Sequence, residues 1–229
     1  MKPRFPRWLA GTALGRYVLH FEAAIETAVS DFAVGLPSGS RVLDAGAGQA
    51  QYAHYFAKHH YTGVDLAVGD ATWDYGRLQA IADLTALPFA AASFDACINI
   101  VTLEHVREPG RAVKELGRVL KRGGSLLLAV PHEWEVHQAP HDYFRFTRHG
   151  IQHLLEQAGF QRIRIDPVGG FFRLLSRRLA SGLQFFPAPL VPVAALFLAP
   201  PALILPLFDF LDRERSFTLG YLCTARKSF

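Results

Sequence analysis

The residues best suited to ligand chemistry begin with a glycine-rich run at residues 42–48. There, Asp44, Gly46 and Gly48 follow an apolar stretch, a pattern typical of a strand that runs into a turn and then a helix. Open α/β sheets bind ligands at the carboxyl ends of their strands, where glycines let a ligand approach the backbone. The turn alone does not identify the ligand, because dinucleotide sites use a similar one, although Ala50 replaces their third glycine here.

Two aspartates downstream add to this signal. Asp65 ends a second apolar run, 17 residues beyond Gly48, where a carboxylate can accept hydrogen bonds from both hydroxyls of a ribose. Asp83 and Leu84 precede Leu-Pro-Phe at residues 87–89. The Asp83 carboxylate can accept a hydrogen bond from an adenine amino group, and Leu84 can form an apolar wall for the ring. Taken singly, either aspartate could also be an exposed loop acid or a helix cap.

Short apolar runs alternate with helical stretches from residue 41 onward. This alternation requires crossover connections and therefore predicts a parallel sheet. Basic residues followed by glycines at 121–124 are expected to stop the helix before them. The expected strands cover residues 41–44, 61–65, 94–100 and 125–130, and the expected helices cover residues 51–58 and 111–120.

The flanking segments follow other patterns. Apolar residues at helical spacing predict a leading helix over residues 13–33. A polar stretch rich in histidine and aromatic residues, 132–147, is expected to be a loop, with Thr147 as N-cap of the helix after it. The remaining expected elements are a helix at 148–157, a strand at 161–166 and a closing strand at 217–226.

With these motifs in one order, residues 42–130 resemble the core of class I S-adenosylmethionine-dependent methyltransferases of the small-molecule type. The resemblance implies an α/β fold with a Rossmann-like seven-stranded sheet, mostly parallel with an antiparallel last strand, and helices on both faces. An N-terminal helix and an apolar helical insertion before the final strand complete the expected fold. It also implies S-adenosyl-L-methionine as the cofactor.

The resemblance assigns roles to individual residues. Asp44 would reach the amino group of the methionine portion, often through water, with Gly46 and Gly48 around it. Asp65 would hold the ribose, and Asp83 with Leu84 the adenine. Asn99 stands where many family members carry an acid, so no carboxylate role is expected there. The full expected cofactor set is Asp44, Ala45, Gly46, Gly48, Asp65, Leu66, Asp83, Leu84, Asn99 and Val101.

Residues 142–147 resemble the Asp-Tyr-x-Arg-Phe-Thr segment of a bacterial methyltransferase group often associated with cell-surface polysaccharide or lipid-linked substrates. A hydroxyl acceptor needs a base near neutrality, whereas a carboxylate or acidic phenol needs none. We expect His141 to be that base, Arg145 to bind or orient an anion, and Tyr143 to form a pocket wall. Alternatively, Arg145 pairs with Asp142 to hold the loop. His105 and His137 are further candidates to reach an acceptor.

Residues 179–208 carry no charge, in a chain with 19% charged residues against about 25% in soluble domains. Six prolines are expected to break any continuous helix long enough to span a bilayer. The segment predicts either an interfacial or re-entrant hairpin in peripheral contact with a membrane, or an apolar cap on the acceptor pocket or a dimer face. The residues expected to support membrane contact are Arg173, Arg177 and Arg178 beside it, with Phe5 and Trp8 near the N-terminus.

Composition narrows the remaining classes. The net charge of +4 and the small basic clusters do not predict nucleic-acid binding. Cys97 and Cys223 each lie in a strand-like apolar run, so buried free thiols in a reducing compartment are expected. Residues 1–15 lack the apolar run of a secretory signal, which favours a cytoplasmic location, at the inner face of a membrane. The histidines of the loop lack compact ligand spacing, so no metal site is expected.

Together these patterns predict a single methyltransferase domain over residues 1–229. Its parts are an N-terminal helical extension (1–40), a cofactor core (41–131), an acceptor-side loop, helix and strand (132–170), an apolar insertion (171–212) and a closing strand (213–229). The expected reaction is methyl transfer to a hydroxyl or carboxyl oxygen of a small or lipid-linked acceptor. The alternatives are a methyltransferase-like protein that holds the cofactor without turnover as a membrane-associated partner, and a nicotinamide oxidoreductase, which residues 83–89 disfavour.

Overall fold

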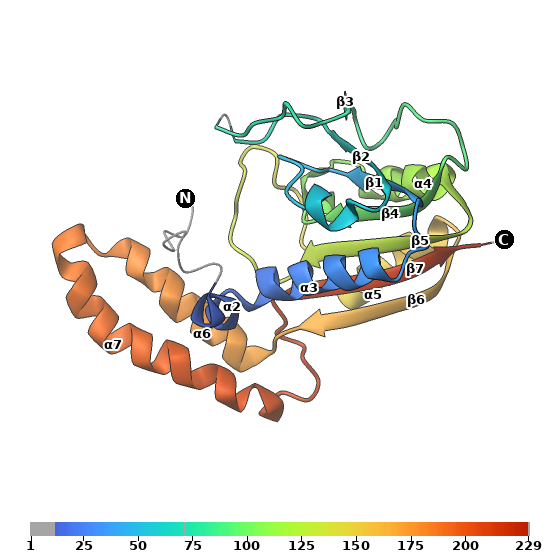
Figure 1. The fold of residues 1–229 in the computed structure, drawn as a ribbon. Helices are drawn as coiled ribbons and strands as arrows, with labels where there is room; N and C mark the ends of the chain where they lie inside the picture. The colour runs from blue at the N-terminus through green and yellow to red at the C-terminus, as the bar shows by residue number, and fades with distance from the viewer. Residues whose placement is uncertain (1–11, 71, 229) are drawn as a thin grey trace. The chain divides into compact units, whose positions relative to one another are not determined.

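The computed structural model describes residues 12–70 and 72–228, in two compact units (Figure 1). The larger unit holds residues 25–132, 138–166 and the chain from 221 onward, and the smaller holds the chain up to 24, 133–137 and 167–220. The membrane contact predicted for Phe5 and Trp8 lies outside the described residues.

A seven-stranded sheet in the order β3-β2-β1-β4-β5-β7-β6 dominates the larger unit. Strands β1 to β5 pair in parallel; Asp44 of β1, for example, lies between Gly63 of β2 and Ile98 of β4. The strands are β1 (Arg41–Ala45), β2 (His60–Asp65), β3 (Ala80–Ile81), β4 (Phe94–Ile100), β5 (Leu120–Pro131), β6 (Phe160–Val168) and β7 (Gly220–Lys227).

The last two strands run in opposite directions. At one end of the pair the Ser228 amide donates to the Gly159 carbonyl at 3.2 Å, and at the other end the Leu219 amide donates to the Val168 carbonyl at 3.1 Å. Rising residue numbers on β6 therefore meet falling numbers on β7, which is the antiparallel pattern. The predicted sheet, mostly parallel with an antiparallel last strand, is confirmed.

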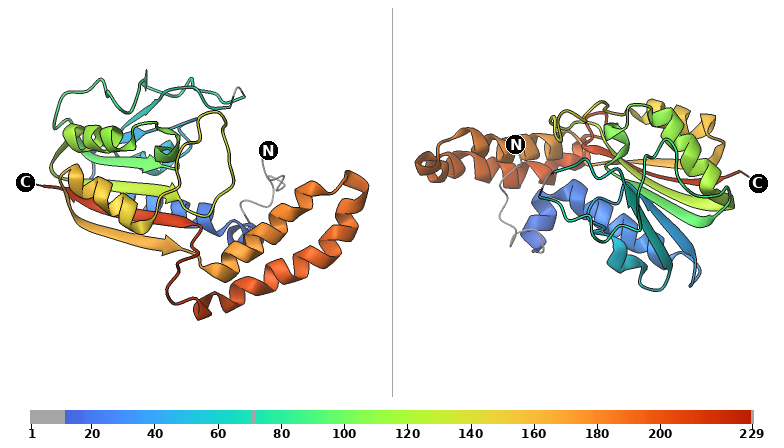
Figure 2. Two further views of the ribbon diagram at one scale, coloured as in Figure 1. Left: turned by 180° about the vertical axis from the view of Figure 1, so that it is seen from behind. Right: turned by 90° about the horizontal axis from the view of Figure 1, so that it is seen from above.

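Helices cover both faces of the sheet. Figure 2 shows α4 (Pro109–Val119) and α5 (Arg148–Gln157) on one face and α3 (His20–Val34) on the other. The buried residues of α4 recur at helical spacing and join the same apolar core as the strands. Thr147 caps α5, its hydroxyl accepting from the Gly150 amide at 3.1 Å, as predicted.

One expectation about helices was wrong. Residues 51–58 form turns with only a 3-10 segment, η1 (Ala53–Phe56), in place of an α-helix. Ala50, just before the stretch, has a left-handed φ of 56°. Phe56 is the only buried residue of the stretch, so a helix here would have no apolar face to pack against the core and stabilise it. The other helix expected in this part of the chain, over residues 111–120, is present as α4, and residues 121–124 form an irregular start to β5.

Two other elements differ in detail. The helix expected over residues 13–33 is divided into α2 (Ala13–Val18) and α3, because Leu19 leaves helical dihedral angles at φ −91° and ψ 54°. β3 was not predicted, because a two-residue strand is too short to show a periodicity. Cys97 and Cys223 are buried and free.

The smaller unit is built on a hairpin of α6 (Phe171–Gly182) and α7 (Val191–Ile204), which lie side by side in Figures 1 and 2. Asp209 caps α6, since its Oδ1 accepts from the amides of Gly170 at 3.1 Å and Arg173 at 3.0 Å. The Ser176 hydroxyl donates to the Ala202 carbonyl and joins the two helices.

The prolines were expected to break a long helix in this segment, but the second arm of the hairpin continues through them. The segments η4 (Ala188–Leu190), α7 and η5 (Leu205–Leu211) form one helical run of 24 residues, Ala188–Leu211, long and apolar enough to cross a membrane by length and composition. Pro189, Pro192 and Pro206 each lie at the first positions of a segment, where the missing amide hydrogen costs little. Pro200 and Pro201 lie inside α7, which continues past them.

Arg177 is a buried cation in the described part of the smaller unit, with its side chain 4% exposed. Its guanidinium lies 3.7 Å from the centre of the Trp134 ring, and both terminal nitrogens donate to the Glu22 carboxylate at 3.1 Å. A bidentate ion pair stacked on an indole fixes α6 against the segments that hold these two partners.

We expect Arg177→Ala to lower the free energy of unfolding by about 1–3 kcal/mol, because it removes both the stacking and the charge-assisted hydrogen bonds. Urea unfolding of the full chain measures this. Arg178→Ala is the matched control, since its 38% exposed side chain pairs with Glu135 at the surface, and it should cost less than about 1 kcal/mol. Equal losses in the two variants would contradict the assigned role of Arg177.

Candidate active site

The turn after β1 is held by one carbonyl. The amides of Gly46 and Ala47 both donate to the Val64 oxygen of β2, at 2.7 and 2.9 Å. Gly46 has a φ of +87°, and a Cβ there would lie 2.3 Å from the Thr102 side chain. The Thr102 hydroxyl donates to the Gly46 carbonyl at 3.1 Å. Only glycine fits this conformation and this close approach, so the strand end requires it.

Asp65 fastens the second strand to the same turn. One carboxylate oxygen accepts from the Gly48 amide at 3.0 Å and the other from the Ala67 amide at 2.8 Å. The acid expected to hold a ribose therefore lies directly beside the glycine turn, at the carboxyl ends of β1 and β2. The exposed Leu66 follows it in the same loop.

Asp44 is a buried acid at the end of β1, with 1% of the residue exposed. One oxygen accepts from the Tyr61 hydroxyl at 2.7 Å, and the other has no hydrogen-bond partner among the described residues. Burial, which penalises the charged form, raises the pKa of Asp44 to about 7. A buried carboxylate oxygen without a partner is a group that an incoming cation would satisfy.

Asn99 joins the ends of β1 and β4. Its fully buried side chain donates from Nδ2 to the Ala45 carbonyl at 2.6 Å. An ionised carboxylate has no proton to donate to that carbonyl, which gives a structural reason for an amide at this position. Val101, just beyond β4, has a left-handed φ of 49° and ends the strand.

The two residues expected at the adenine differ in exposure. Asp83 is exposed, and its Oδ1 accepts from both the amide and the hydroxyl of Thr85 at 2.8 Å. Leu84 is 5% exposed and belongs to the apolar core of the larger unit. Their contact with an adenine ring stays a prediction.

A second wall of the glycine turn has no direct signal in the sequence. Trp73 lies over Gly48, with a ring carbon 3.4 Å from where a Cβ would stand. Two hydrogen bonds shape this loop: Tyr75 accepts from the Gly69 amide at 2.9 Å, and Gln49 accepts from the Asp74 amide at 3.2 Å. The available hint was the pair of aromatic residues, Trp73 and Tyr75, in this loop.

His141 and Tyr143 meet in the acceptor loop. The Tyr143 hydroxyl accepts from Arg107 Nε at 2.9 Å and lies 3.1 Å from His141 Nδ1. A phenol oxygen can accept two hydrogen bonds, so it can also receive a proton held on Nδ1. That tautomer leaves Nε2 of His141 with a free lone pair, as a general base requires.

Hydrogen bonds join the acceptor loop to the segment after β4. The amides of Tyr143 and Phe144 donate to the Glu104 carbonyl at 3.0 and 3.2 Å. His105 Nδ1 lies 2.5 Å from the His141 carbonyl. His105 thus positions the His141 backbone.

Arg145 makes a bidentate pair with Asp142, at 2.6 and 2.8 Å. This is the loop-holding arrangement weighed as an alternative for Arg145, and its action on an anion stays a prediction. His137, another candidate to reach the acceptor, belongs to the smaller unit, where its Nδ1 lies 3.1 Å from the Glu135 carbonyl.

Comparison with known proteins identifies the domain built on this turn. Residues 43–128 match the family model described as "Methyltransferase domain". Residues 43–128 therefore form a methyltransferase domain. It is 36% identical over 107 residues to a tRNA (carboxymethyluridine(34)-5-O)-methyltransferase of Arabidopsis thaliana, covering 44% of this chain and 26% of that protein. It is 37% identical over 108 residues to a demethylmenaquinone methyltransferase of Renibacterium salmoninarum, covering 42% and 44%.

The fold of the methyltransferase domain extends over the whole chain in solved structures. A putative methyltransferase from Haloferax volcanii, solved in complex with the activator Trm112, aligns over 100% of both chains with a TM-score of 0.59 and 18% identity. The curated relatives share less of their length: this chain spans about a quarter of the Arabidopsis protein. The unpartnered Asp44 oxygen beside the glycine turn suits the ammonium group of S-adenosylmethionine, the cofactor that the sequence predicts.

We expect cofactor affinity to rise between about pH 5.5 and 7.5, because Asp44, with its pKa raised to about 7, becomes ionised there and attracts the ammonium group. Asp44→Asn should bind about tenfold more weakly at the upper end of this window and lose the pH dependence. Calorimetry across the window measures both quantities.

The same shift makes the folded protein less stable as pH rises from about 4 to 7, because the unfolded state releases the Asp44 proton first. Asp44→Asn should flatten this slope. Asp31→Asn, which alters an exposed acid of α3, is the control. A pH dependence of binding that survives Asp44→Asn would contradict the assignment.

Proposed function

We propose that this protein is a methyltransferase that transfers the methyl group of S-adenosylmethionine to a hydroxyl or carboxyl oxygen of a small or lipid-linked acceptor, at the cytoplasmic face of a membrane. The observation that carries the proposal is the glycine turn, joined to Asp65 through the Gly48 amide and flanked by the half-paired, buried Asp44. It lies within the segment that matches the methyltransferase domain.

S-adenosylmethionine supplies an electrophilic methyl group on a sulfonium. The residues of the acceptor loop have the complementary task of aligning an oxygen with that methyl carbon, since positioning supplies much of the acceleration in such a displacement. As the oxygen–carbon bond forms and the carbon–sulfur bond breaks, His141 Nε2 takes the proton of a hydroxyl acceptor. A carboxylate acceptor has no proton to lose and would need no base.

Two observations support an oxygen atom as the methyl acceptor. The contact between His141 and Tyr143, 3.1 Å apart, permits the tautomer that a hydroxyl acceptor requires. The Arabidopsis relative is named as a 5-O-methyltransferase, so the shared domain occurs in a protein named for transfer to oxygen.

A reaction assay tests the activity. Purified protein with labelled S-adenosylmethionine and a membrane lipid extract should label a lipid fraction. His141→Gln should lower kcat by about 100-fold or more without changing cofactor affinity. Arg148→Gln, an exposed residue of α5, is the control.

The outcomes separate the parts of the proposal. Failure to label any lipid fraction, with cofactor binding intact, would remove the lipid-linked acceptor. Labelling that is unaffected by His141→Gln would remove the base. If no S-adenosylhomocysteine accumulates even in a complete cell extract, the protein holds the cofactor without turnover.

The lipid-linked acceptor is supported by the helical run Ala188–Leu211, of whose most apolar 18-residue window only 17% is buried. Its exposed large side chains include Val193, Leu196, Phe197, Ile204 and Leu207. Their spacing places them on one face of a helix, while Ala194 and Ala202 are buried. A continuous apolar face of this kind suits insertion into one leaflet of a bilayer.

The arginines beside the run are engaged within the smaller unit. Arg173 lies 3.6 Å from Asp209, Arg177 pairs with Glu22 and Arg178 pairs with Glu135. These cations are already neutralised by carboxylates, so membrane contact through this unit would depend on apolar insertion more than on attraction to anionic headgroups. We therefore expect binding to neutral lipid that changes little with salt.

Vesicle binding measures this directly. The full chain should sediment with phosphatidylcholine vesicles, and the double substitution Leu196→Asp and Phe197→Asp, at residues 71% and 70% exposed, should reduce binding by about tenfold or more. Val34→Asp is the matched control, because Val34 is 84% exposed but lies at the end of α3. If the double variant instead dissolves a dimer and the wild type ignores vesicles, the face binds a second copy and the membrane proposal fails.

A further inference from the structure

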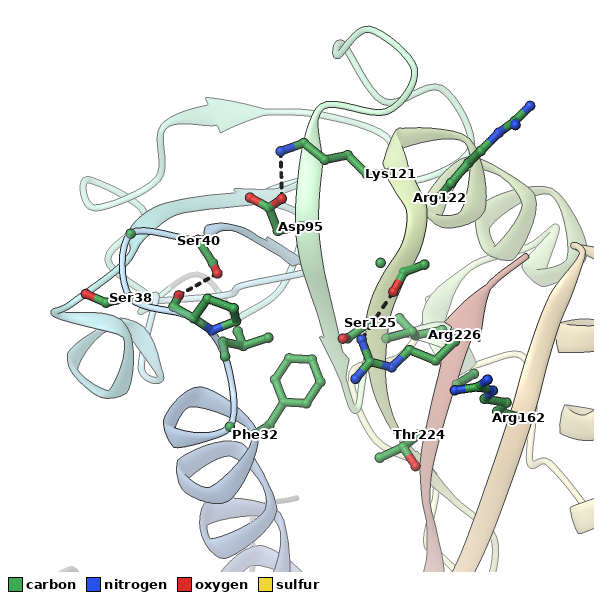
Figure 3. Close-up of a pocket in the computed structure, with 18 residues that line it drawn as sticks. Phe32, Ser38, Ser40, Asp95, Lys121, Arg122, Ser125, Arg162, Thr224 and Arg226 are labelled. Carbon is green, nitrogen blue, oxygen red and sulfur yellow. Dashed lines mark hydrogen bonds and ion pairs between the residues drawn. The ribbon is translucent and has the colours of Figure 1, made fainter. Parts of the chain in front are cut away.

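A cavity lies in the larger unit, away from the glycine turn. It has a volume of about 740 Å³ and is lined by the loop before β1, the starts of β4, β5 and β6 and the end of β7 (Figure 3). The glycine turn follows the carboxyl end of β1, whereas Ser40 precedes its amino end. Because β1, β4 and β5 are parallel, the cavity is at the opposite edge of the sheet from the methyl-donor site.

Cations outnumber acids around this cavity. Its lining includes Lys121, Arg122, Arg162 and Arg226 but one acid, Asp95. Asp95 accepts from Lys121 Nζ at 2.6 Å with one oxygen and from the Arg41 amide at 2.8 Å with the other. Asp95 thus forms its ion pair with Lys121. The lining holds no other acid that could neutralise the guanidinium groups of Arg122, Arg162 and Arg226.

The guanidinium groups are available to a ligand. Arg226 donates to the Gly123 carbonyl at 3.2 Å, which orients the group without neutralising its charge. Within the described part of the chain, the guanidinium groups of Arg122 and Arg162 make no hydrogen bond or ion pair. Figure 3 shows the Arg226 guanidinium beside Ser125, with Arg162 next to it on the neighbouring strand and Arg122 at the rim.

The rest of the lining divides into a polar and an apolar part. Ser125 and Thr224 supply hydroxyls on the side of the arginines, and Ser38 lies across the cavity from them (Figure 3). Across the cavity the ring of Phe32 faces the Arg226 side chain (Figure 3), with Leu36 beside it in the lining. A half-buried aromatic ring opposite a guanidinium leaves a slot suited to a flat ring system, and the volume is in the range of small-molecule sites.

We propose that this cavity binds a phosphate-bearing small molecule of the nucleotide class. Its phosphates would lie on Arg226 and Arg162, because the planar guanidinium fork matches phosphate oxygens in pairs. Its base would stack on Phe32. The site is separate from the cofactor turn, so the ligand and S-adenosylmethionine can be bound together.

Calorimetry on protein saturated with S-adenosylhomocysteine tests the proposal, because saturation removes binding of an adenine to the cofactor turn. ATP and GTP should bind, pyrophosphate more weakly, and adenosine not at all. Arg226→Ala should weaken nucleotide binding by about tenfold or more. Phe32→Leu should weaken nucleotides but leave pyrophosphate unchanged.

Arg111→Ala is the charge-matched control, since Arg111 is a 60% exposed residue of α4 and is not part of the lining. It should bind nucleotides as the wild type does. Circular dichroism checks that each variant is folded, and Arg226→Lys, which keeps the charge but loses the fork, should restore binding only in part. Absence of nucleotide binding in the saturated protein, binding unchanged by Arg226→Ala, or equal affinity for pyrophosphate and nucleotides would overturn the proposal.

Discussion

The Val64 carbonyl oxygen is the point on which the cofactor side of this protein depends. By accepting from two consecutive amides, those of Gly46 and Ala47, it turns the chain sharply at the end of β1 and keeps that end against β2. The turn brings Gly48 to Asp65 and leaves Asp44 buried below. The Gly48 amide and the carboxyl groups of Asp44 and Asp65 are thereby brought to one edge of a parallel sheet, as ligand sites in open α/β sheets require.

Burial then tunes what the turn brings together. Asp44 is taken out of water with one oxygen paired to Tyr61 and the other unpaired, which raises its pKa to about 7. Such an acid is poorly satisfied until a cation arrives. A cationic methyl donor would give the unpaired Asp44 oxygen a partner and so remove an unfavourable free energy of the folded chain. Binding of the ligand should therefore stabilise the domain.

Much of this arrangement could be predicted from the sequence because it depends on local constraints. Glycine at positions 46 and 48 reflects left-handed dihedral angles, and Thr147 caps α5 with its own side chain. The structure of residues 51–58 could not be predicted in the same way. Their sequence pattern suggested a helix, whereas Phe56 is the only one of these residues that is buried. Burial, which decides between helix and turn there, is a property of the whole fold.

The same limit applies to side-chain partners. The sequence identified Arg145, Tyr143 and His141 as neighbours, but the pairing of Arg145 with Asp142 and of Tyr143 with Arg107 depends on loop geometry. Trp73 over Gly48 joins residues 25 positions apart with no shared pattern. Six prolines suggested a broken segment at 179–208, yet three of them, Pro189, Pro192 and Pro206, occupy first positions of helical segments where they are tolerated.

A crystal structure with S-adenosylhomocysteine would test whether the turn after β1, with Asp44 and Asp65, forms the methyl-donor site. We expect the ligand's ammonium group within hydrogen-bond distance of Asp44, directly or through one water, and its ribose hydroxyls on Asp65. A ligand bound elsewhere, or bound at the turn without either acid, would contradict it.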